Sequence, residues 1–244
     1  MRAERGARGR GYTVITPANH YPSRLPQFAD VPVIKLVTPR LAPARIGQYL
    51  VALGSGDATV HAVDSGKETF LYVLEGDASL SVPGSESALS SGGYAYVPAT
   101  VEWEIEAGEM GAKLVFIRRT YDAFSDLRAP AMCVGHRDDE PFSATAVPGF
   151  TRRELLPVED PAFDFAMTLL AFEPDVGLGK IEIHDEEHGL LMTRGSGTYT
   201  LDADQHMVRA GDFIYMAPYC PQGFSAGPDG AEYLLYKDAW RDGF

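Results

Sequence analysis

Residues 209–218, Arg-Ala-Gly-Asp-Phe-Ile-Tyr-Met-Ala-Pro, repeat a pattern that residues 91–98, Ser-Gly-Gly-Tyr-Ala-Tyr-Val-Pro, present earlier in the chain. In both stretches a glycine precedes a short apolar run that a proline ends, and the two prolines lie 120 positions apart. Glycine supplies the positive φ angle of a tight turn, and proline ends a strand because it has no N–H to donate to the ladder. Each stretch therefore predicts a turn followed by a short β-strand.

Two further pairs of segments recur at nearly the same offset. Glu75-Gly76 matches Arg194-Gly195, and residues 113–118 match residues 232–237, both at an offset of 119. Three matches in one order and at nearly one offset indicate a tandem duplication, with the repeated pattern of strand, glycine turn and strand. Short runs rich in Val, Ile, Tyr, Phe and Leu recur about every ten residues, which is typical of an all-β sandwich or barrel.

This punctuation resembles that of the cupin family of small jelly-roll β-barrels. The resemblance covers roughly residues 30–240 and implies an all-β fold of two tandem cupin barrels, a bicupin. We expect a tail and lead-in segment over 1–29, an N-terminal barrel over 30–121, a connection over 122–149 and a C-terminal barrel over 150–244.

The composition limits the class of protein. Hydrophobic residues make up 45% of the 244 residues, which is enough for a folded core, and no apolar run is long enough to cross a membrane. The net charge of -13 argues against a nucleic-acid partner. No apolar segment follows the Arg-rich first ten residues, so we expect a solvated tail rather than a secretory signal. With only two cysteines, we expect a cytoplasmic protein without disulfides.

Candidate metal ligands lie in the second module, in the stretch G-K-I-E-I-H-D-E-E-H-G-L-L at 179–191. Side chains at i and i+2 of an extended strand share a face, so Glu182 and His184 can converge, and a turn through 185–187 can bring His188 beside them. Cupins draw a fourth ligand from the place that Gln222 occupies. Such a set suits a divalent first-row metal with open positions.

The corresponding positions of the first module carry no such set. They hold Val63, Ser65, Thr69 and Glu102, and the nearby His61 stands alone. We therefore expect one metal per chain, bound in the C-terminal barrel.

The order of these ligands is distinctive among metal cupins, which usually present H-x-H, then Glu, then a later His. Here Glu comes first, His stands where Glu is usual, and Gln replaces the last His. Together with E-T-F-L-Y-V-L-E-G at 68–76, Y-L-L-Y-K-D at 233–238 and V-I-T-P at 14–17, this order resembles the (S)-ureidoglycine aminohydrolase family. The resemblance implies a manganese enzyme of allantoin and purine breakdown, which hydrolyses (S)-ureidoglycine to (S)-ureidoglycolate and ammonia. It implies Glu182, His184, His188 and Gln222 as the ligands of Mn²⁺.

The resemblance also implies substrate-binding roles for Tyr199, Tyr233, Lys237 and Glu182. Tyr233 and Lys237 share one face of a strand, and a Lys inside a barrel needs an anion, which a substrate carboxylate would supply. Tyr199 is also compatible with an ordinary core aromatic. We expect Lys237 to hold the carboxylate and Glu182 to move a proton between amine and water. The charged residues between the ligands, at 185–187, are expected to be solvated.

Two other functions stay open. An iron bicupin dioxygenase usually offers three His, or three His and a Glu, and a non-catalytic binding module would need neither a converging metal set nor a Lys in the barrel. The metal itself is open, because the usual affinity order favours other ions over manganese. Bicupins commonly assemble and edge strands favour pairing, so we expect a homo-oligomer.

Overall fold

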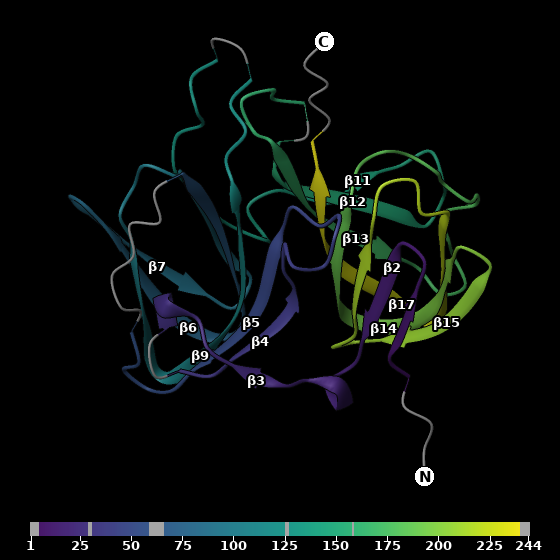
Figure 1. The fold of residues 1–244 in the computed structure, drawn as a ribbon, viewed down its shortest axis with the longest axis horizontal. Helices are drawn as coiled ribbons and strands as arrows, with labels where there is room; N and C mark the ends of the chain where they lie inside the picture. Colours follow the sequence, from purple (N-terminus) through teal and green to yellow (C-terminus); the bar gives the residue numbers. More distant parts are fainter. Residues whose placement is uncertain (1–4, 29–30, 59–65, 125–126, 158, 240–244) are drawn as a thin grey trace. The chain divides into compact units, whose positions relative to one another are not determined.

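The computed structural model describes residues 5–28, 31–58, 66–124, 127–157 and 159–239 (Figure 1). The chain divides into two compact units. One unit, Tyr21–Asp139, is here called the N-terminal barrel, and the other, which joins Met1–His20 to Glu140–Phe244, is called the C-terminal barrel. The described part is built of strands, with two short 3-10 helices, η1 (Pro17–Asn19) and η2 (Pro26–Phe28). This confirms the predicted all-β fold with two barrels.

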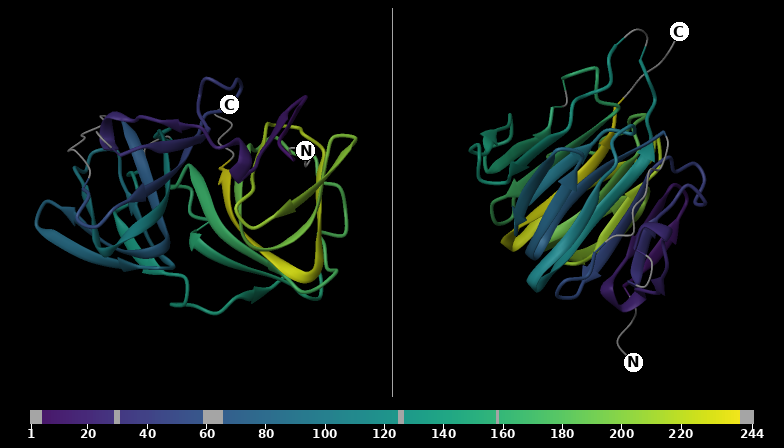
Figure 2. Two further views of the ribbon diagram at one scale, coloured as in Figure 1. Left: turned by 90° about the horizontal axis from the view of Figure 1, so that it is seen from below. Right: turned by 90° about the vertical axis from the view of Figure 1, so that its left-hand side faces the viewer.

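The N-terminal barrel contains a sheet in the order β10-β8-β6-β9-β5-β4-β3, with β7 paired to β6. Its strands are curved (Figure 2). The core of this barrel includes Val51, Leu71, Trp103 and Leu114. The strand bounds are β3 (Pro22–Ser23), β4 (Val33–Val37), β5 (Gly47–Leu53), β6 (Lys67–Val82), β7 (Ser85–Ser90), β8 (Gly93–Val97), β9 (Glu104–Thr120) and β10 (Cys133–His136).

The C-terminal barrel contains a sheet in the order β1-β2-β16-β14-β17-β13-β12-β11, with β15 paired to β14. Its core includes Leu170, Leu190, Leu201 and Phe224. The strand bounds are β1 (Ala7–Gly9), β2 (Tyr12–Ile15), β11 (Ser143–Ala144), β12 (Phe150–Leu156), β13 (Phe165–Phe172), β14 (His188–Leu201), β15 (Asp204–Arg209), β16 (Phe213–Met216) and β17 (Gln222–Asp238).

The two sheets repeat one topology, since β8-β6-β9-β5-β4 in one corresponds to β16-β14-β17-β13-β12 in the other. A buried polar pair is repeated as well. The Tyr96 hydroxyl donates to the Glu68 carboxylate at 2.6 Å, and the Tyr215 hydroxyl donates to the Glu187 carboxylate at 3.0 Å. Both members of the second pair lie 119 positions after those of the first, which confirms the tandem duplication.

Gly76 and Gly195 have positive φ angles of 76° and 70°. The prediction that a glycine turn separates two strands at these positions is wrong. Both residues lie inside one long strand, β6 or β14, at a β-bulge that bends it. A Cβ atom at either position would lie 2.0 Å from a backbone carbonyl oxygen, that of Gly111 or Gly230. Only glycine therefore allows the neighbouring strand to approach at the bend.

The segment expected to be a tail contributes two strands to the C-terminal barrel. Strand β2 pairs with β16, and its Tyr12 and Val14 side chains enter the core. This segment forms a strand of the barrel because buried and partly buried residues alternate along Tyr12–Ile15, which gives the strand one apolar face. Strand β10 likewise lies within the expected connection 122–149 and pairs with β8. Strand β2 therefore lies beside β16, and β10 lies beside β8. Strands β16 and β8 are the corresponding short strands of the two repeats.

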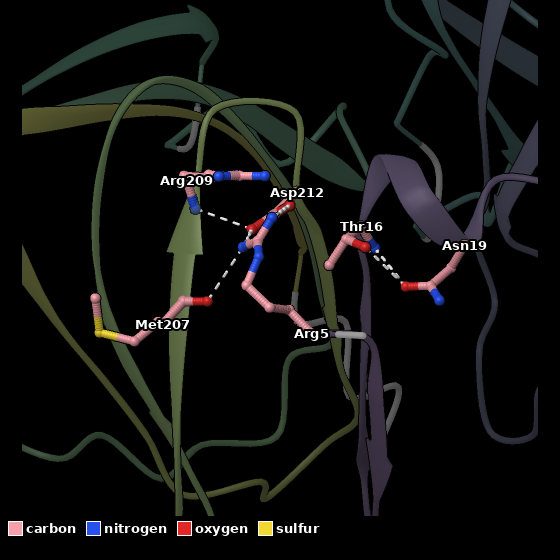
Figure 3. A network of polar contacts seen from close by, with 6 residues as sticks. All are labelled: Arg5, Thr16, Asn19, Met207, Arg209 and Asp212. Atoms are coloured by element: carbon pink, nitrogen blue, oxygen red, sulfur yellow. Dashed lines mark hydrogen bonds and ion pairs between the residues drawn. The ribbon is translucent and has the colours of Figure 1, made fainter. Parts of the chain in front are cut away.

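A network of polar contacts holds the start of the chain to the same barrel (Figure 3). The Arg5 guanidinium donates to both carboxylate oxygens of Asp212, at 3.0 Å for the Nη2–Oδ1 pair, and to the Met207 carbonyl at 3.3 Å. Asp212 is fully buried and also accepts from the Arg209 backbone N–H at 2.9 Å. Beyond β2, the Thr16 hydroxyl donates to the Asn19 side chain at 2.8 Å. The described part of the tail is thus anchored rather than solvated.

No helix among the described residues is long and apolar enough to cross a membrane.

Candidate metal centre

The segment that precedes β14 is held beside the start of β17 by backbone hydrogen bonds. Glu182 donates its N–H to the Gln222 carbonyl at 2.8 Å, and Gln222 donates to the Glu182 carbonyl at 3.0 Å. The Tyr219 N–H donates to the His184 carbonyl at 2.7 Å. His188 and Gln222 open β14 and β17. Residues separated by about 40 positions are therefore brought to one end of the barrel.

Three predicted ligands converge there. The His184 Nε2 atom lies 3.2 Å from the His188 Nε2 atom and 3.0 Å from the Gln222 side-chain amide nitrogen. His188 and Gln222 are buried. Burial, together with the neighbouring His184 and Lys237, lowers the pKa of His188 to about 3. The His188 imidazole is therefore neutral at physiological pH, which is the form that a metal binds.

The donor set fits a divalent cation. Adjacent ligands of an octahedral ion with bonds of about 2.1 Å lie about 3.0 Å apart, which matches these separations. A 180° flip of the Gln222 amide exchanges its oxygen and nitrogen, so the oxygen can occupy the inner position. Among the described residues, no three His, Cys, Asp or Glu side chains form a group that could hold a metal. The third donor beside the two imidazoles is the side-chain amide of Gln222. His184, His188 and Gln222 are the residues that can hold a metal here.

Glu182, the fourth predicted ligand, does not join this group. Its carboxylate Oε1 lies 3.2 Å from the Lys180 Nζ atom, and a third of its side chain is exposed. Its charge nevertheless reaches the barrel interior, because it raises the pKa of both Tyr199 and Tyr233. Ligation by Glu182 would require its side chain to leave Lys180 and turn toward the imidazoles.

Tyr199 and Tyr233 lie in the core of the C-terminal barrel, and their phenol groups interact electrostatically. Both rings also contact Phe224. Burial, followed by the partner phenol and the Glu182 charge, raises the pKa of Tyr233 well above its ordinary value, and burial likewise raises the pKa of Tyr199. The two hydroxyls therefore remain protonated and can donate hydrogen bonds to an anion.

Lys237 lies opposite His188 in the β14–β17 ladder, so the two side chains leave the sheet on one face. Its ammonium Nζ lies 2.8 Å from Glu186 Oε1. The anion that a Lys inside the barrel needs is therefore already supplied in part by the protein, and the pairing with a substrate carboxylate stays a prediction. The sequence analysis did not predict Glu186 as a site residue. Its position two residues after His184 could have indicated it, because side chains at i and i+2 of an extended segment share a face.

The acidic residues 185–187 differ in environment. Glu187 is buried and accepts from Tyr215, and Glu186 is mostly buried between two site residues, so the expectation that both are solvated is wrong. Only Asp185 stays partly exposed without a described contact.

Comparison with known proteins assigns the chain to a family. It is 32% identical to (S)-ureidoglycine aminohydrolase of Arabidopsis thaliana, over 96% of this chain and 77% of that protein. It is 30% identical to the Escherichia coli (S)-ureidoglycine aminohydrolase, over 95% of this chain and 89% of that protein. The chain belongs to the (S)-ureidoglycine aminohydrolase family. This confirms the predicted resemblance and identifies the chain as a hydrolase of C–N bonds.

Solved structures agree with the fold. A protein of Pseudomonas aeruginosa superposes with a TM-score of 0.88 at 26% identity, over 97% of this chain and 91% of its own. A cupin barrel protein of Leptotrichia buccalis superposes with a TM-score of 0.63 at 16% identity, over 92% of this chain and 95% of its own, which shows the cupin fold alone. No family model matches the chain.

The predicted metal ligands of the C-terminal barrel are not repeated in the described part of the N-terminal barrel. Thr69, at the position of His188, is a buried hydroxyl, and Glu102, at the position of Gln222, is exposed. Val63, Ser65 and His61 lie outside the described residues. The expectation of one metal per chain stays a prediction.

Proposed function

We propose that the protein is a manganese-dependent (S)-ureidoglycine aminohydrolase, which hydrolyses (S)-ureidoglycine to (S)-ureidoglycolate and ammonia in allantoin breakdown. The observation that carries this proposal is the convergence of His184, His188 and Gln222 beside Lys237, in a chain of this family. A small carboxylate substrate suits a half-buried ammonium next to such a site.

His184, His188 and Gln222 would hold the metal, with Glu182 as the fourth ligand. The bound cation would supply Lewis acidity and a positive charge at the reacting centre. Nitrogen and oxygen donors without a thiolate suit manganese, although they suit several other first-row ions. Metal content measured on purified protein is therefore part of the test.

Lys237 and Tyr233 would bind the substrate carboxylate. An ammonium has three N–H donors, and Glu186 occupies one, which leaves two for a second carboxylate. The Tyr233 hydroxyl is protonated, because burial raises its pKa well above the ordinary value. Fixing the carboxylate fixes which face of the substrate carbon accepts oxygen, and hence the S configuration of the product.

Glu182 would move the proton that the reaction requires. Hydrolysis breaks the bond from carbon to the amine, forms a bond from carbon to a water oxygen, and transfers one water proton to the departing nitrogen. A partly exposed carboxylate close to the two phenols can accept that proton and return it as ammonia leaves.

We further propose that the enzyme acts in the cytoplasm as a homo-oligomer. Both cysteines, Cys133 and Cys220, are free thiols, which supports a reducing compartment. Light scattering on the purified protein measures the assembly, and fractionation of the source cells measures the location.

The decisive experiment follows ammonia release from freshly generated (S)-ureidoglycine and the chirality of the product. We expect stoichiometric ammonia, (S)-ureidoglycolate, no oxygen uptake and about one manganese per chain. Oxygen consumption would favour the dioxygenase, and neither product would favour a binding module. Metal retained in full by a chain with both His184→Ala and His188→Ala would refute the ligand assignment.

A further inference from the structure

Glu186 connects the two halves of the candidate site through one carboxylate. Its Oε2 atom lies 2.8 Å from the His184 Nδ1 atom, and its Oε1 atom lies 2.8 Å from the Lys237 Nζ atom. Only 16% of the Glu186 side chain is exposed. A flexible side chain in one of the most acidic stretches of the sequence is thus held between a predicted ligand and a predicted substrate contact.

The contact with His184 bears on which ring nitrogen carries the proton. The His184 Nδ1 atom is screened from solvent and has no aligned hydrogen-bond partner, and the Glu186 carboxylate lies 2.8 Å from it, within reach of its N–H after a small rotation. A neutral imidazole with its proton on Nδ1 presents a lone pair on Nε2. That Nε2 atom faces His188 and Gln222 at 3.2 Å and 3.0 Å.

The contact with Lys237 uses the other oxygen of the same carboxylate. The Lys237 Nζ atom lies 2.8 Å from Oε1, so the carboxylate is held between an imidazole and an ammonium. A carboxylate paired with an ammonium accepts hydrogen bonds, and it therefore disfavours a His184 tautomer that would turn a lone pair toward it.

We propose that Glu186 is a positioning residue, whose one oxygen fixes the Nδ1–H tautomer of His184 and whose other oxygen holds the Lys237 ammonium beside the same site. The role assigned to the site rests on the proposed function, whereas the tautomer and the pairing are properties of the metal-free fold. Carboxylates that receive the second N–H of a ligating His orient the ring and raise its basicity, and their loss typically costs 10- to 100-fold in metal affinity.

The test measures the ¹⁵N spectrum of the His184 imidazole in metal-free protein, at a pH above which the spectrum no longer changes. We expect a protonated Nδ1 and an unprotonated Nε2 in the unaltered chain and in Lys237→Met. Glu186→Leu should give a mixture of tautomers. Asp185→Leu is the matched control, because it removes the same charge one position away and should leave the spectrum unchanged.

Manganese affinity is the second readout. The dissociation constant should rise by about 10- to 100-fold in Glu186→Leu and less in Glu186→Gln, which keeps an acceptor oxygen and the shape of the side chain. It should stay near the unaltered value in Asp185→Leu. Should Glu186→Leu fail to fold, Glu186→Gln still decides, through an intermediate affinity and a partial change of tautomer.

An unchanged tautomer and metal affinity in both Glu186 variants would overturn the proposal, as would an Nε2-protonated ring in the unaltered chain. A chain that binds no manganese or releases no ammonia would refute the proposed function instead. The tautomer measurement on metal-free protein would still decide the role of Glu186.

Discussion

Lys237 and Tyr233, which we propose to bind the substrate carboxylate, are here called the carboxylate clamp. Replacement of Lys237 by Met tests this clamp most directly. The substitution keeps the aliphatic stem and removes the ammonium that lies 2.8 Å from Glu186. Loss of one partner of a buried charge pair costs about 2–5 kcal/mol in binding. Since 35% of the Lys237 side chain is exposed, solvent screening places the cost near the lower end, about 2–3 kcal/mol.

At 1.36 kcal/mol per decade, this corresponds to a loss of roughly 30- to 150-fold in kcat/KM. Most of it should fall in KM, because the clamp contacts the carboxylate in both the ground state and the transition state. Part of the loss should come from the unpaired Glu186 anion that remains and repels the substrate. The double variant Glu186→Gln with Lys237→Met should therefore bind substrate better than Lys237→Met alone.

Steady-state ammonia release by metal-replete protein is the assay, with Lys180→Met as the control. Lys180 is 70% exposed and pairs with Glu182 at 3.2 Å, and such a surface pair contributes less than about 1 kcal/mol, so its loss should change kcat/KM less than fivefold. Turnover by Lys237→Met within the range of the Lys180 control, on folded protein that retains its metal, would refute the clamp and require another cation for the carboxylate.

Three further predictions concern the stability of the fold. Gly195→Ala and Gly76→Ala should each lower the free energy of unfolding by more than about 2 kcal/mol, because a left-handed conformation is strained for alanine and its Cβ would meet a carbonyl oxygen. Thermal unfolding measures this loss, and a midpoint equal to that of the unaltered chain would show that the bulge relaxes. Arg5→Ala should cost about 3 kcal/mol in urea unfolding, since it leaves the buried Asp212 carboxylate without its cation, and no loss would mean that the contact is not formed in solution. In metal-free protein the folded-state pKa of His188 lies below its unfolded value of about 6.5, so the unfolded chain binds more protons as the pH falls. The free energy of unfolding should therefore decrease by about 2 kcal/mol from pH 6.5 to pH 5, and by less in His188→Gln; equal pH dependence in both chains would contradict the buried neutral imidazole.

Local patterns in the sequence were enough to predict the duplication, the all-β fold and two of the three converging site residues. Gly211 and Pro218 recur with their counterparts at Gly92 and Pro98 because turn geometry and strand ends depend on single residue types. The even spacing of His184 and His188 indicated one face because side-chain direction alternates along extended backbone. Gln222 needed the family resemblance, since an amide on its own carries no ligand signal.

Tertiary structure alone decided what pairs with what. Glu186 and Glu187 are adjacent carboxylates of one type, yet one lies between His184 and Lys237 while the other is buried against Tyr215. Lys237 and Tyr215 come from strands about 30–50 positions away, and no local pattern records which side chains a barrel brings opposite these carboxylates. The same holds for β2, because a four-residue apolar alternation predicts a strand but does not identify β16 as its neighbour. A strand is stabilised by the edge that it pairs with, and that edge exists only once the barrel has formed.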